Sequence, residues 1–204
     1  MVRIDRIYTR GGDAGETSIG SGLRVSKLHP RIIAGGAVDE LNCAIGVAIS
    51  QGPDALVAER LRRLQQLLFD LGADLCTPWQ SSPDEPDRCP RMQESHVGML
   101  ESIIDEQTQH LAPLQSFIIP GGTPAAAAVH LARSIARRAE IEVLRLAEFD
   151  AVNPQLRICL NRISDLLFVL ARIANGNGRM DVLWIPGTSG QPYEEPQSSP
   201  GDSL

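Results

Sequence analysis

The segment "RIYTRGGDAGETSIGSGLRVSK", near the start of the chain, combines glycines, hydroxyl side chains and cations. Glycines leave backbone N–H groups free to face a ligand, and hydroxyl and cationic side chains bind anionic oxygen atoms, so this chemistry suits a polyphosphate. With almost no apolar residue to hold it, such a loop is entropically costly to order unless a partner binds, and a mobile N-terminal arm is the alternative. It is not a Walker P-loop, because the chain has no Gly-Lys pair.

A second group of polar residues follows helical spacing. His130, Arg133, Arg137 and Glu140 step by three, four and three residues, so on a helix they form one polar stripe, with Arg138 beside it. The same segment is rich in alanine, which favours a central helix whose arginines need anionic partners. A solvated face on an exposed helix is the alternative.

A third group lies in "LNRISDLLFVLARIAN". Asn161, Asp165, Phe168 and Arg172 fall on one helical stripe, and Arg162 is spaced to contact Asp165. An internal Arg–Asp brace is the alternative explanation for these charges. The pattern is nevertheless similar to that of the arginine stripe, which suggests that the two stripes belong to one site.

Asp39 and Asn42 in "AVDELN" lie one helical turn apart, shortly after the glycine-rich segment. Polar stripes on three helices together predict a shared site. The four histidines form no H-E-x-x-H motif and no E-x-x-H pair, which gives a protein metal site no support. No serine or cysteine can be matched to a base by spacing, so hydrolase chemistry is unsupported as well.

The elements that must position these residues are helices, because apolar residues recur at helical spacing almost everywhere beyond residue 30. Thr123-Pro124 and Asn153-Pro154 each supply a capping side chain followed by a proline suited to the first helical position. Strand-like alternation is nearly absent. The prediction is an all-α fold, a single antiparallel five-helix bundle. The five helices carry Val38 to Ala48, Val57 to Leu75, Val97 to Leu111, Val129 to Leu146, and Leu156 to Ala174.

Length and composition limit the class of protein. The 204 residues favour one domain, expected over 1–185 with the binding loop at about 8–27, and a proline-rich tail over 186–204 that we expect to be disordered. The net charge of −6 argues against a nucleic-acid binder. Scattered cysteines and no signal-peptide pattern indicate a cytoplasmic protein with reduced thiols, and no stretch approaches the unbroken apolar length of a membrane span.

Four motifs carry a resemblance to a known family: "YTRGGDAGETSIGSGLRVSK", "AVDELNCAIGVA", "FIIPGGTPAAAAVHLARSIARRAE" and "LNRISDLLFVLARIAN". In this order, over most of the first 175 residues, the chain resembles the PduO-type, MMAB-like ATP:corrinoid adenosyltransferases. The resemblance implies five-helix bundles assembled as homotrimers, with ATP bound between subunits. It also implies transfer of the 5′-deoxyadenosyl group of ATP to cob(I)alamin, which forms adenosylcobalamin and releases triphosphate.

The resemblance also assigns roles to residues of the N-terminal loop, which would wrap the triphosphate. The matching loop positions are Thr9, Arg10, Gly12, Asp13, Gly15, Thr17, Ser18 and Lys27. Arg133 and Arg137 match arginines that reach the phosphates or brace the neighbouring subunit, and Asp39 matches the acidic residue paired with that helix. Further ATP-site positions, at the subunit interface, are Arg138, Glu140 and Asn161.

Phe117, just before the "PGG" turn, matches the aromatic residue that the family places against the corrin. By similarity its side chain displaces the lower axial ligand and leaves a four-coordinate Co(II) that is easier to reduce. The alternative role for Phe117 is a buried loop anchor. Adenosyl transfer itself needs in-line placement and neutralisation of the departing triphosphate, which cations and Mg²⁺, bound mainly through the ATP phosphates, can supply.

The chain departs from the family pattern at Gly35, where an aromatic residue is common, and at Gly11 and Ala14, where Thr and Lys are frequent. Corrinoid preference or affinity is expected to reflect these differences. Two alternatives stay open: a carrier that delivers adenosylcobalamin to a mutase with catalysis secondary, and a helical scaffold that binds no ATP. Expected partners are ATP, cob(I)alamin, a reductase and an adenosylcobalamin-dependent acceptor enzyme, without nucleic acid or membrane.

Overall fold

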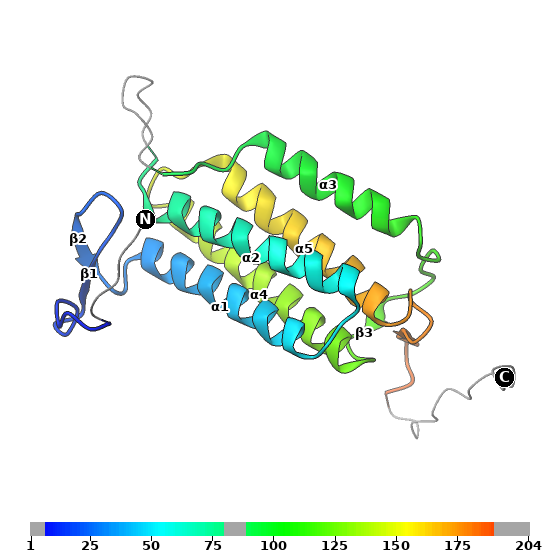
Figure 1. Cartoon of the computed structure of the whole chain (residues 1–204). Coiled ribbons are helices and arrows are strands. Elements are labelled where there is room, and N and C mark those ends of the chain that lie inside the picture. The colour runs from blue at the N-terminus through cyan, green and yellow to red at the C-terminus, as the bar shows by residue number, and fades with distance from the viewer. Residues whose placement is uncertain (1–6, 80–88, 190–204) are drawn as a thin grey trace, which may run out of the picture.

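Five helices form an antiparallel bundle in the computed structural model, which describes residues 7–79 and 89–189 (Figure 1). The predicted all-α fold with five helices is confirmed. The third helix ends at Thr108, so Leu111, which we expected on it, is buried in the loop beyond. The helices are α1 (Pro30–Ser50), α2 (Ala55–Cys76), α3 (Glu94–Thr108), α4 (Pro124–Ala147) and α5 (Pro154–Ala174).

Both predicted pairs of capping residue and proline begin helices. The Thr123 hydroxyl accepts a hydrogen bond from the backbone N–H of Ala126 at 3.1 Å, which starts α4. The Asn153 side chain accepts from the N–H of Gln155 at 3.0 Å at the start of α5. These bonds satisfy backbone donors that have no partner inside the helix, and proline at the first position lacks such a donor.

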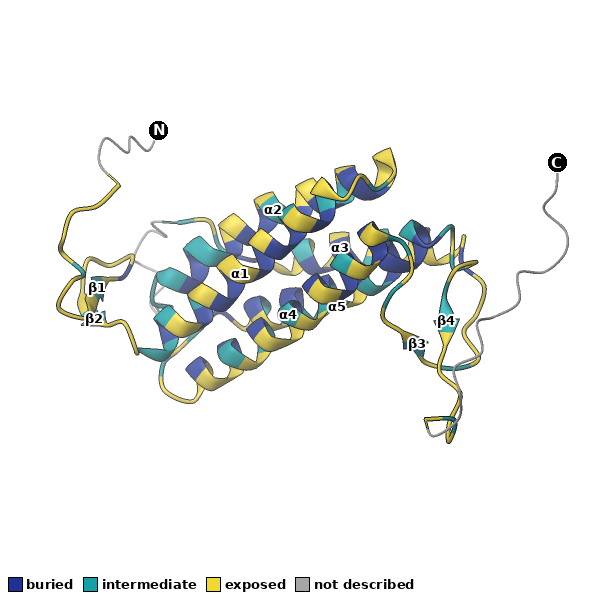
Figure 2. Cartoon of the chain, turned by 90° about the horizontal axis from the view of Figure 1, so that it is seen from below, coloured by how far each residue is buried: buried dark blue, intermediate teal, exposed yellow. Residues whose placement is uncertain are grey.

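Helix α4 packs against α1 on one side and α5 on the other. Helix α2 packs on α1 and reaches α5, and α3 covers the outer side of α5. Ala132, Ala136 and Ala139 of α4 are fully buried, and their short side chains let the neighbouring helices approach closely. In Figure 2 the buried residues face the inside of the bundle and the exposed residues lie on the outer faces of the helices.

Buried polar side chains fix one end of the bundle. The fully buried Arg31 of α1 donates to the backbone oxygen of Leu75 at 2.6 Å and pairs with Asp150 in the turn between α4 and α5. Asp74, equally buried on α2, accepts from the Arg91 guanidinium at 2.7 Å and from the Asn153 side chain at 2.7 Å. These contacts join α1, α2, the segment before α3 and the start of α5.

Two short antiparallel ribbons lie at opposite ends of the bundle (Figure 1). Strand β1 (Glu16–Ser18) pairs with β2 (Arg24–Ser26) ahead of α1, and β3 (Ile118–Ile119) pairs with β4 (Val182–Leu183) beside the start of α4. Strands of two or three residues are too short to give an alternating pattern, so the spacing of apolar residues does not reveal them. The second ribbon positions the cavity described below.

By length and composition alone, α1 is apolar enough to cross a membrane, with a mean hydropathy of 1.6 over its best window. Arg31, Asp39 and Glu40 interrupt this helix, so it is not the unbroken apolar stretch that the sequence was expected to lack. The core helix of a water-soluble bundle passes the same test, and α1 packs between α2 and α4. Its buried polar side chains, Arg31 and Asn42, are hydrogen-bonded to other parts of the protein.

Candidate functional site

The polar stripes predicted on α4 and α5 meet along the seam between these two helices. Because the helices run antiparallel, Glu140 lies opposite Asn161, whose side-chain amide donates to the Glu140 carboxylate at 3.3 Å. Toward the other end of the seam, the His130 ring lies 6.1 Å from the Phe168 ring, centroid to centroid. The two stripes therefore form one continuous polar line that ends among aromatic side chains.

Two arginines of this line have no anionic partner within the described residues. Arg133 is half-buried, and its Nε is buried without a hydrogen-bond partner. Burial lowers the pKa of Arg133, and the charge of Arg137 lowers it further. Arg137 itself is exposed. Two unpaired cations one turn apart repel each other, so an anionic ligand would be bound favourably here.

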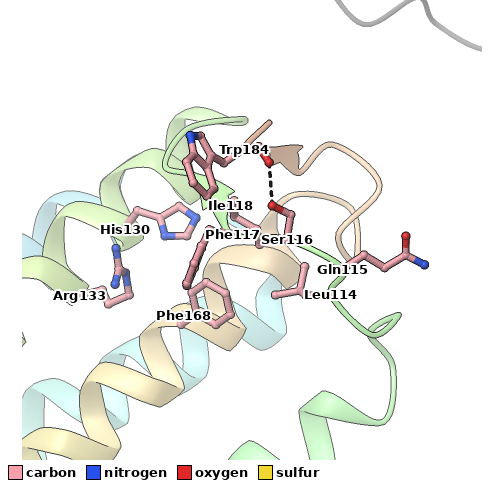
Figure 3. Close-up of a pocket in the computed structure, with 9 residues that line it drawn as sticks. All are labelled: Leu114, Gln115, Ser116, Phe117, Ile118, His130, Arg133, Phe168 and Trp184. Atoms are coloured by element: carbon pink, nitrogen blue, oxygen red, sulfur yellow. Dashed lines mark hydrogen bonds between the residues drawn. The ribbon is translucent and has the colours of Figure 1, made fainter. Parts of the chain in front are cut away.

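A cavity of about 630 Å³ opens beside this line, at the end of the bundle that carries β3 and β4 (Figure 3). Its walls are mostly apolar, with three aromatic rings facing the same space. His130 and Arg133 are the charged or titratable residues among those that line it. The apolar lining comes from Leu114, Phe117, Ile118, Phe168 and Trp184. Such a space suits a large, flat, mainly apolar ligand with a few polar groups.

Phe117 and Trp184 are placed by the second ribbon rather than by the core. The backbone N–H of Trp184 donates to the backbone oxygen of Phe117 at 2.7 Å, and the Ser116 hydroxyl donates to the backbone oxygen of Trp184 at 2.6 Å. The two rings lie 6.2 Å apart. Phe117 is 77% exposed, so the alternative of a buried loop anchor is wrong.

A buried cluster of Arg172, Asn175 and Asp181, hereafter the Asp181 cluster, holds the two segments of the ribbon together. The Asp181 carboxylate accepts from Arg172 Nε at 2.8 Å and from Asn175 Nδ2 at 3.0 Å. Arg172 also donates to the backbone oxygen of Ala112 at 3.0 Å, and Asn175 Oδ1 accepts from the N–H of Thr123 at 3.0 Å. The cluster therefore fixes both ends of the loop 112–123 that carries Phe117.

The "PGG" turn is shaped by the same cluster. Gly122 has a φ of +93°, and a Cβ atom at this position would lie 2.1 Å from Asn175 Oδ1. Only glycine fits at position 122, because of the positive φ and because a side chain would clash with Asn175. Helical spacing predicted that Arg172 lies on the stripe facing the shared site, whereas Arg172 is a buried support for the loop. Arg172 and Asp181 are close in the sequence and are separated by glycine-rich turns, and this spacing was the sequence signal for a structural ion pair.

The N-terminal loop is a hairpin with an apolar attachment to the bundle. Ile19 is buried, and the Gly20 N–H donates to the backbone oxygen of Cys76 at 2.9 Å. Ile19 is thus the apolar anchor of a loop that was expected to have almost none. Gly15, at a φ of +82°, accepts from the N–H of Lys27 at 2.8 Å through its backbone oxygen, which closes the hairpin base.

Most predicted loop residues point to solvent. Gly12 and Thr17 are half-buried, and the Lys27 ammonium group lies close against Gly12, 3.0 Å from where a Cβ atom would be. Arg10 stacks on the Tyr8 ring at 5.8 Å from its centroid. The exposed members are Thr9, Arg10, Asp13, Gly15, Ser18 and Lys27.

The loop residues and the arginine stripe do not come together within one chain. No hydrogen bond or ion pair joins residues 7–27 to Arg133 or Arg137 in the described structure, and the hairpin stands at the far end of the bundle from the cavity. Asp39 is exposed on α1 without an ion-pair partner among the described residues, and its neighbour Glu40 pairs with Arg138.

Asn42 does not join the site. It is buried against α2, where it donates to the backbone oxygen of Gln65 at 3.2 Å and its own backbone oxygen accepts from the Gln65 side chain at 3.3 Å. Within one described chain the polar line is formed by the stripes of α4 and α5, and the role expected of Asp39 stays a prediction.

Replacing the carboxylate of the Asp181 cluster should loosen the ribbon. In Asp181→Ala, the buried Arg172 loses its partner, which typically lowers the free energy of unfolding by about 3–5 kcal/mol. Amide hydrogen exchange in 112–119 and 180–185 should accelerate more than in α1. Asp105→Ala, an exposed carboxylate on α3, is the matched control and should change neither quantity. Unchanged exchange at the Trp184 amide in Asp181→Ala would contradict the role of the cluster.

Comparisons with known proteins agree with this geometry. The family model described as cobalamin adenosyltransferase matches residues 7–174. The chain is 44% identical over 191 residues to a corrinoid adenosyltransferase of Mycobacterium leprae, covering 91% of this chain and 98% of the relative. It is 37% identical over 175 residues to the corrinoid adenosyltransferase MMAB of Mus musculus, covering 85% and 74%.

A solved structure of similar fold is a phenylalanine-to-histidine variant of the PduO-type ATP:corrinoid adenosyltransferase from Lactobacillus reuteri, complexed with cobalamin and ATP. It aligns with a TM-score of 0.80 at 39% identity, covering 88% of this chain and 96% of that chain. The sequence and the fold thus lead to the same assignment: the chain belongs to the cobalamin adenosyltransferase family.

Proposed function

We propose that this protein transfers the 5′-deoxyadenosyl group of ATP to cob(I)alamin, forming adenosylcobalamin and triphosphate. The observation that carries the proposal is the seam between α4 and α5, where unpaired arginines lie next to a large aromatic cavity. Arginines bind phosphate oxygens, and an apolar, aromatic space accepts a corrin ring. Membership of the family and the likeness to a structure holding both cobalamin and ATP support the same assignment.

The ATP site would be completed by a second copy of the chain. The hairpin of one chain lies far from its own Arg133 and Arg137, so a neighbouring hairpin would bring Thr9, Arg10 and Lys27 to the phosphates. The outer faces of α1 and α4 offer an apolar surface for such contacts through Ile33, Val47, Leu131 and Ile141, which are all exposed. The homotrimer that the family resemblance implies is the proposed assembly, and light scattering that finds only monomer would contradict it.

The reaction needs positioning and charge neutralisation. The Co(I) electron pair attacks C5′, the Co–C bond forms, the C5′–O bond breaks, and its electron pair leaves with triphosphate. Arg133 and Arg137 would stabilise that departing charge, and Glu140 with Asn161 would orient the nucleoside. No group of three or more His, Cys, Asp or Glu side chains gathers among the described residues, so Mg²⁺ would be held mainly by phosphate oxygens, where it neutralises charge.

Co(I) must be generated from Co(II) by a one-electron reductant, and this step is assigned to the cavity. Phe117, exposed and held by the ribbon, would occupy the space below the corrin and displace the lower axial ligand. A reductase, an acceptor enzyme and a cytoplasmic location stay predictions, as do the domain boundary at 185 and the tail, most of which lies outside the described residues.

The proposal is tested with purified protein, ATP, Mg²⁺ and chemically reduced cobalamin while the corrin absorption spectrum is followed. We expect the spectrum of adenosylcobalamin to develop, with one triphosphate released for each cobalamin converted. A helical scaffold would bind neither ATP nor cobalamin, and a pure carrier would bind adenosylcobalamin without forming it. Either result would contradict the assigned activity.

Arg137→Ala should reduce turnover with little effect on folding. Arg137 is exposed and unpaired among the described residues, so its removal breaks no hydrogen bond or ion pair there. A lost charge-assisted contact to the leaving group, worth about 1.5–3 kcal/mol, lowers kcat/KM roughly 10–150-fold. Arg145→Ala, an exposed arginine on the same helix paired only with Glu142, is the control and should retain activity. A large fall in the melting temperature of Arg137→Ala alone would argue for a structural role.

Phe117→Ala should separate reduction from transfer. If the ring displaces the lower ligand, the variant should lose most activity when Co(II) is reduced in the site and much less when Co(I) is supplied directly. Because the side chain is 77% exposed, the melting temperature should hardly change. Phe69→Ala, which removes an exposed ring from α2, is the matched control. Equal losses in the two assays would show that the ring does not act on the cobalt ligand.

A further inference from the structure

His130 is buried with neither ring nitrogen hydrogen-bonded. Its side chain is 2% exposed, and Nδ1 and Nε2 are both shielded from water without a partner among the described residues. Buried polar atoms are nearly always hydrogen-bonded, because leaving one unpaired is unfavourable by the free energy of its lost hydration. An unpaired imidazole in a tightly packed bundle therefore needs a reason, and a ligand that supplies the missing partners is one.

The imidazole borders the cavity beside the seam. Figure 3 places His130 between Arg133 on its own helix and the rings of Phe117 and Phe168. Along α4 it lies seven residues before Arg137, about 10 Å along the helix axis. His130 thus belongs to the apolar end of the line, next to the ribbon, and the phosphate-binding arginines extend away from it.

The charge state of His130 limits what it can bind. Burial lowers its pKa, the Arg133 guanidinium lowers it further, and Asp181 acts in the opposite direction. The ring is accordingly neutral near pH 7, with one N–H donor and one nitrogen acceptor. An anion in this part of the cavity would be bound by Arg133, so the group that matches His130 is a neutral one offering both a donor and an acceptor.

The two substrates differ in this respect. The rim of a corrin ring carries neutral primary carboxamides, each with a carbonyl acceptor and an N–H donor. ATP also has neutral polar groups in its ribose hydroxyls and adenine. Its triphosphate, however, would be bound by Arg133 and Arg137, which follow His130 along α4. Apart from Arg133, Gln115 and Ser116, the residues that line the cavity with His130 are aromatic or aliphatic. The apolar surroundings and the place at the ribbon end favour the corrinoid.

We propose that His130 is a corrinoid-binding residue that hydrogen-bonds a peripheral carboxamide of the corrin ring and so fixes the position of the ring over Phe117. This inference rests on the proposed function, and it adds a specificity-determining polar contact to a cavity whose other contacts with the ring are mainly apolar. In the free protein the imidazole has no hydrogen-bond partner among the described residues, and the bound corrinoid supplies one.

A ligand-binding role and a structural role predict opposite effects on stability. If His130 served the fold, replacing it would destabilise the bundle. If His130 binds a ligand instead, replacing it with an apolar side chain of similar size removes two unpaired buried nitrogens and leaves the stability unchanged or higher. Only the second role combines undiminished stability with weaker corrinoid binding.

The test compares the full-length wild type with His130→Leu, His130→Gln and the control Ser134→Ala. Ser134 lies one turn along the same helix, and its hydroxyl donates only to the backbone oxygen of His130. Chemical denaturation measures stability without ligand, absorption titration measures cob(II)alamin binding, and calorimetry measures ATP binding. We expect His130→Leu to be as stable as the wild type or more so, to bind cob(II)alamin about tenfold more weakly or worse, and to bind ATP within about twofold of the wild type.

His130→Gln keeps one donor and one acceptor and should recover part of the lost cob(II)alamin affinity, and Ser134→Ala should behave as the wild type. The inference is overturned if His130→Leu binds cob(II)alamin as tightly as the wild type, if it weakens ATP binding instead, or if it lowers stability. A wild type that binds cob(II)alamin but forms no adenosylcobalamin from Co(I) and ATP contradicts the proposed function, while the binding comparison still decides the role of His130.

Discussion

The close packing of α4 between α1 and α5 is the constraint on which the rest of the molecule depends. Fully buried alanines along one stripe of α4 bring its neighbours near enough to leave no room for larger side chains. With the alanine stripe facing inward, the stripe of His130, Arg133, Arg137 and Glu140 is turned to the seam with α5. Side-chain positions in the proposed site are therefore set by the packing of the core.

The same packing leaves polar groups in an unfavourable state. His130 and Arg133 carry buried nitrogens without partners, and two arginines lie one turn apart without a carboxylate between them. These features lower the stability of the free protein, and ligands of matching charge and polarity would relieve them. By contrast, Arg172 and Arg31, which serve the fold, each pair with a carboxylate, although the Nε atom of Arg31 is also buried without a hydrogen-bond partner among the described residues. A carboxylate partner, present for Arg31 and Arg172 and absent for Arg133 among the described residues, thus distinguishes the structural arginines from the candidate binding arginine.

The two ends of the bundle have different tasks. One carries the glycine-rich hairpin, attached through Ile19 and Gly20. The other carries the aromatic cavity. Its loop and ribbon are held in place by the backbone hydrogen bond between Trp184 and Phe117 and by the hydrogen bond between Asn175 and the start of α4, just after the "PGG" turn. Since the hairpin of a chain does not reach its own arginines, assembly of several chains is the simplest way to complete the proposed ATP site.

The sequence by itself determined the helices and much of the line of site residues, because helix formation and capping are local. Apolar spacing and the capping pairs Thr123-Pro124 and Asn153-Pro154 predicted the helices of the bundle. Steps of three and four residues placed Arg133 on one stripe with Glu140, and Asn161 on one stripe with Phe168. Tertiary structure decided what depends on contacts between distant segments. It placed Asn42 against α2, made Arg172 a support rather than a site residue, and paired Trp184 with Phe117 through strands too short to leave a pattern. It also left His130 without a partner, which spacing cannot reveal, since whether a buried nitrogen is hydrogen-bonded depends on every element packed around it.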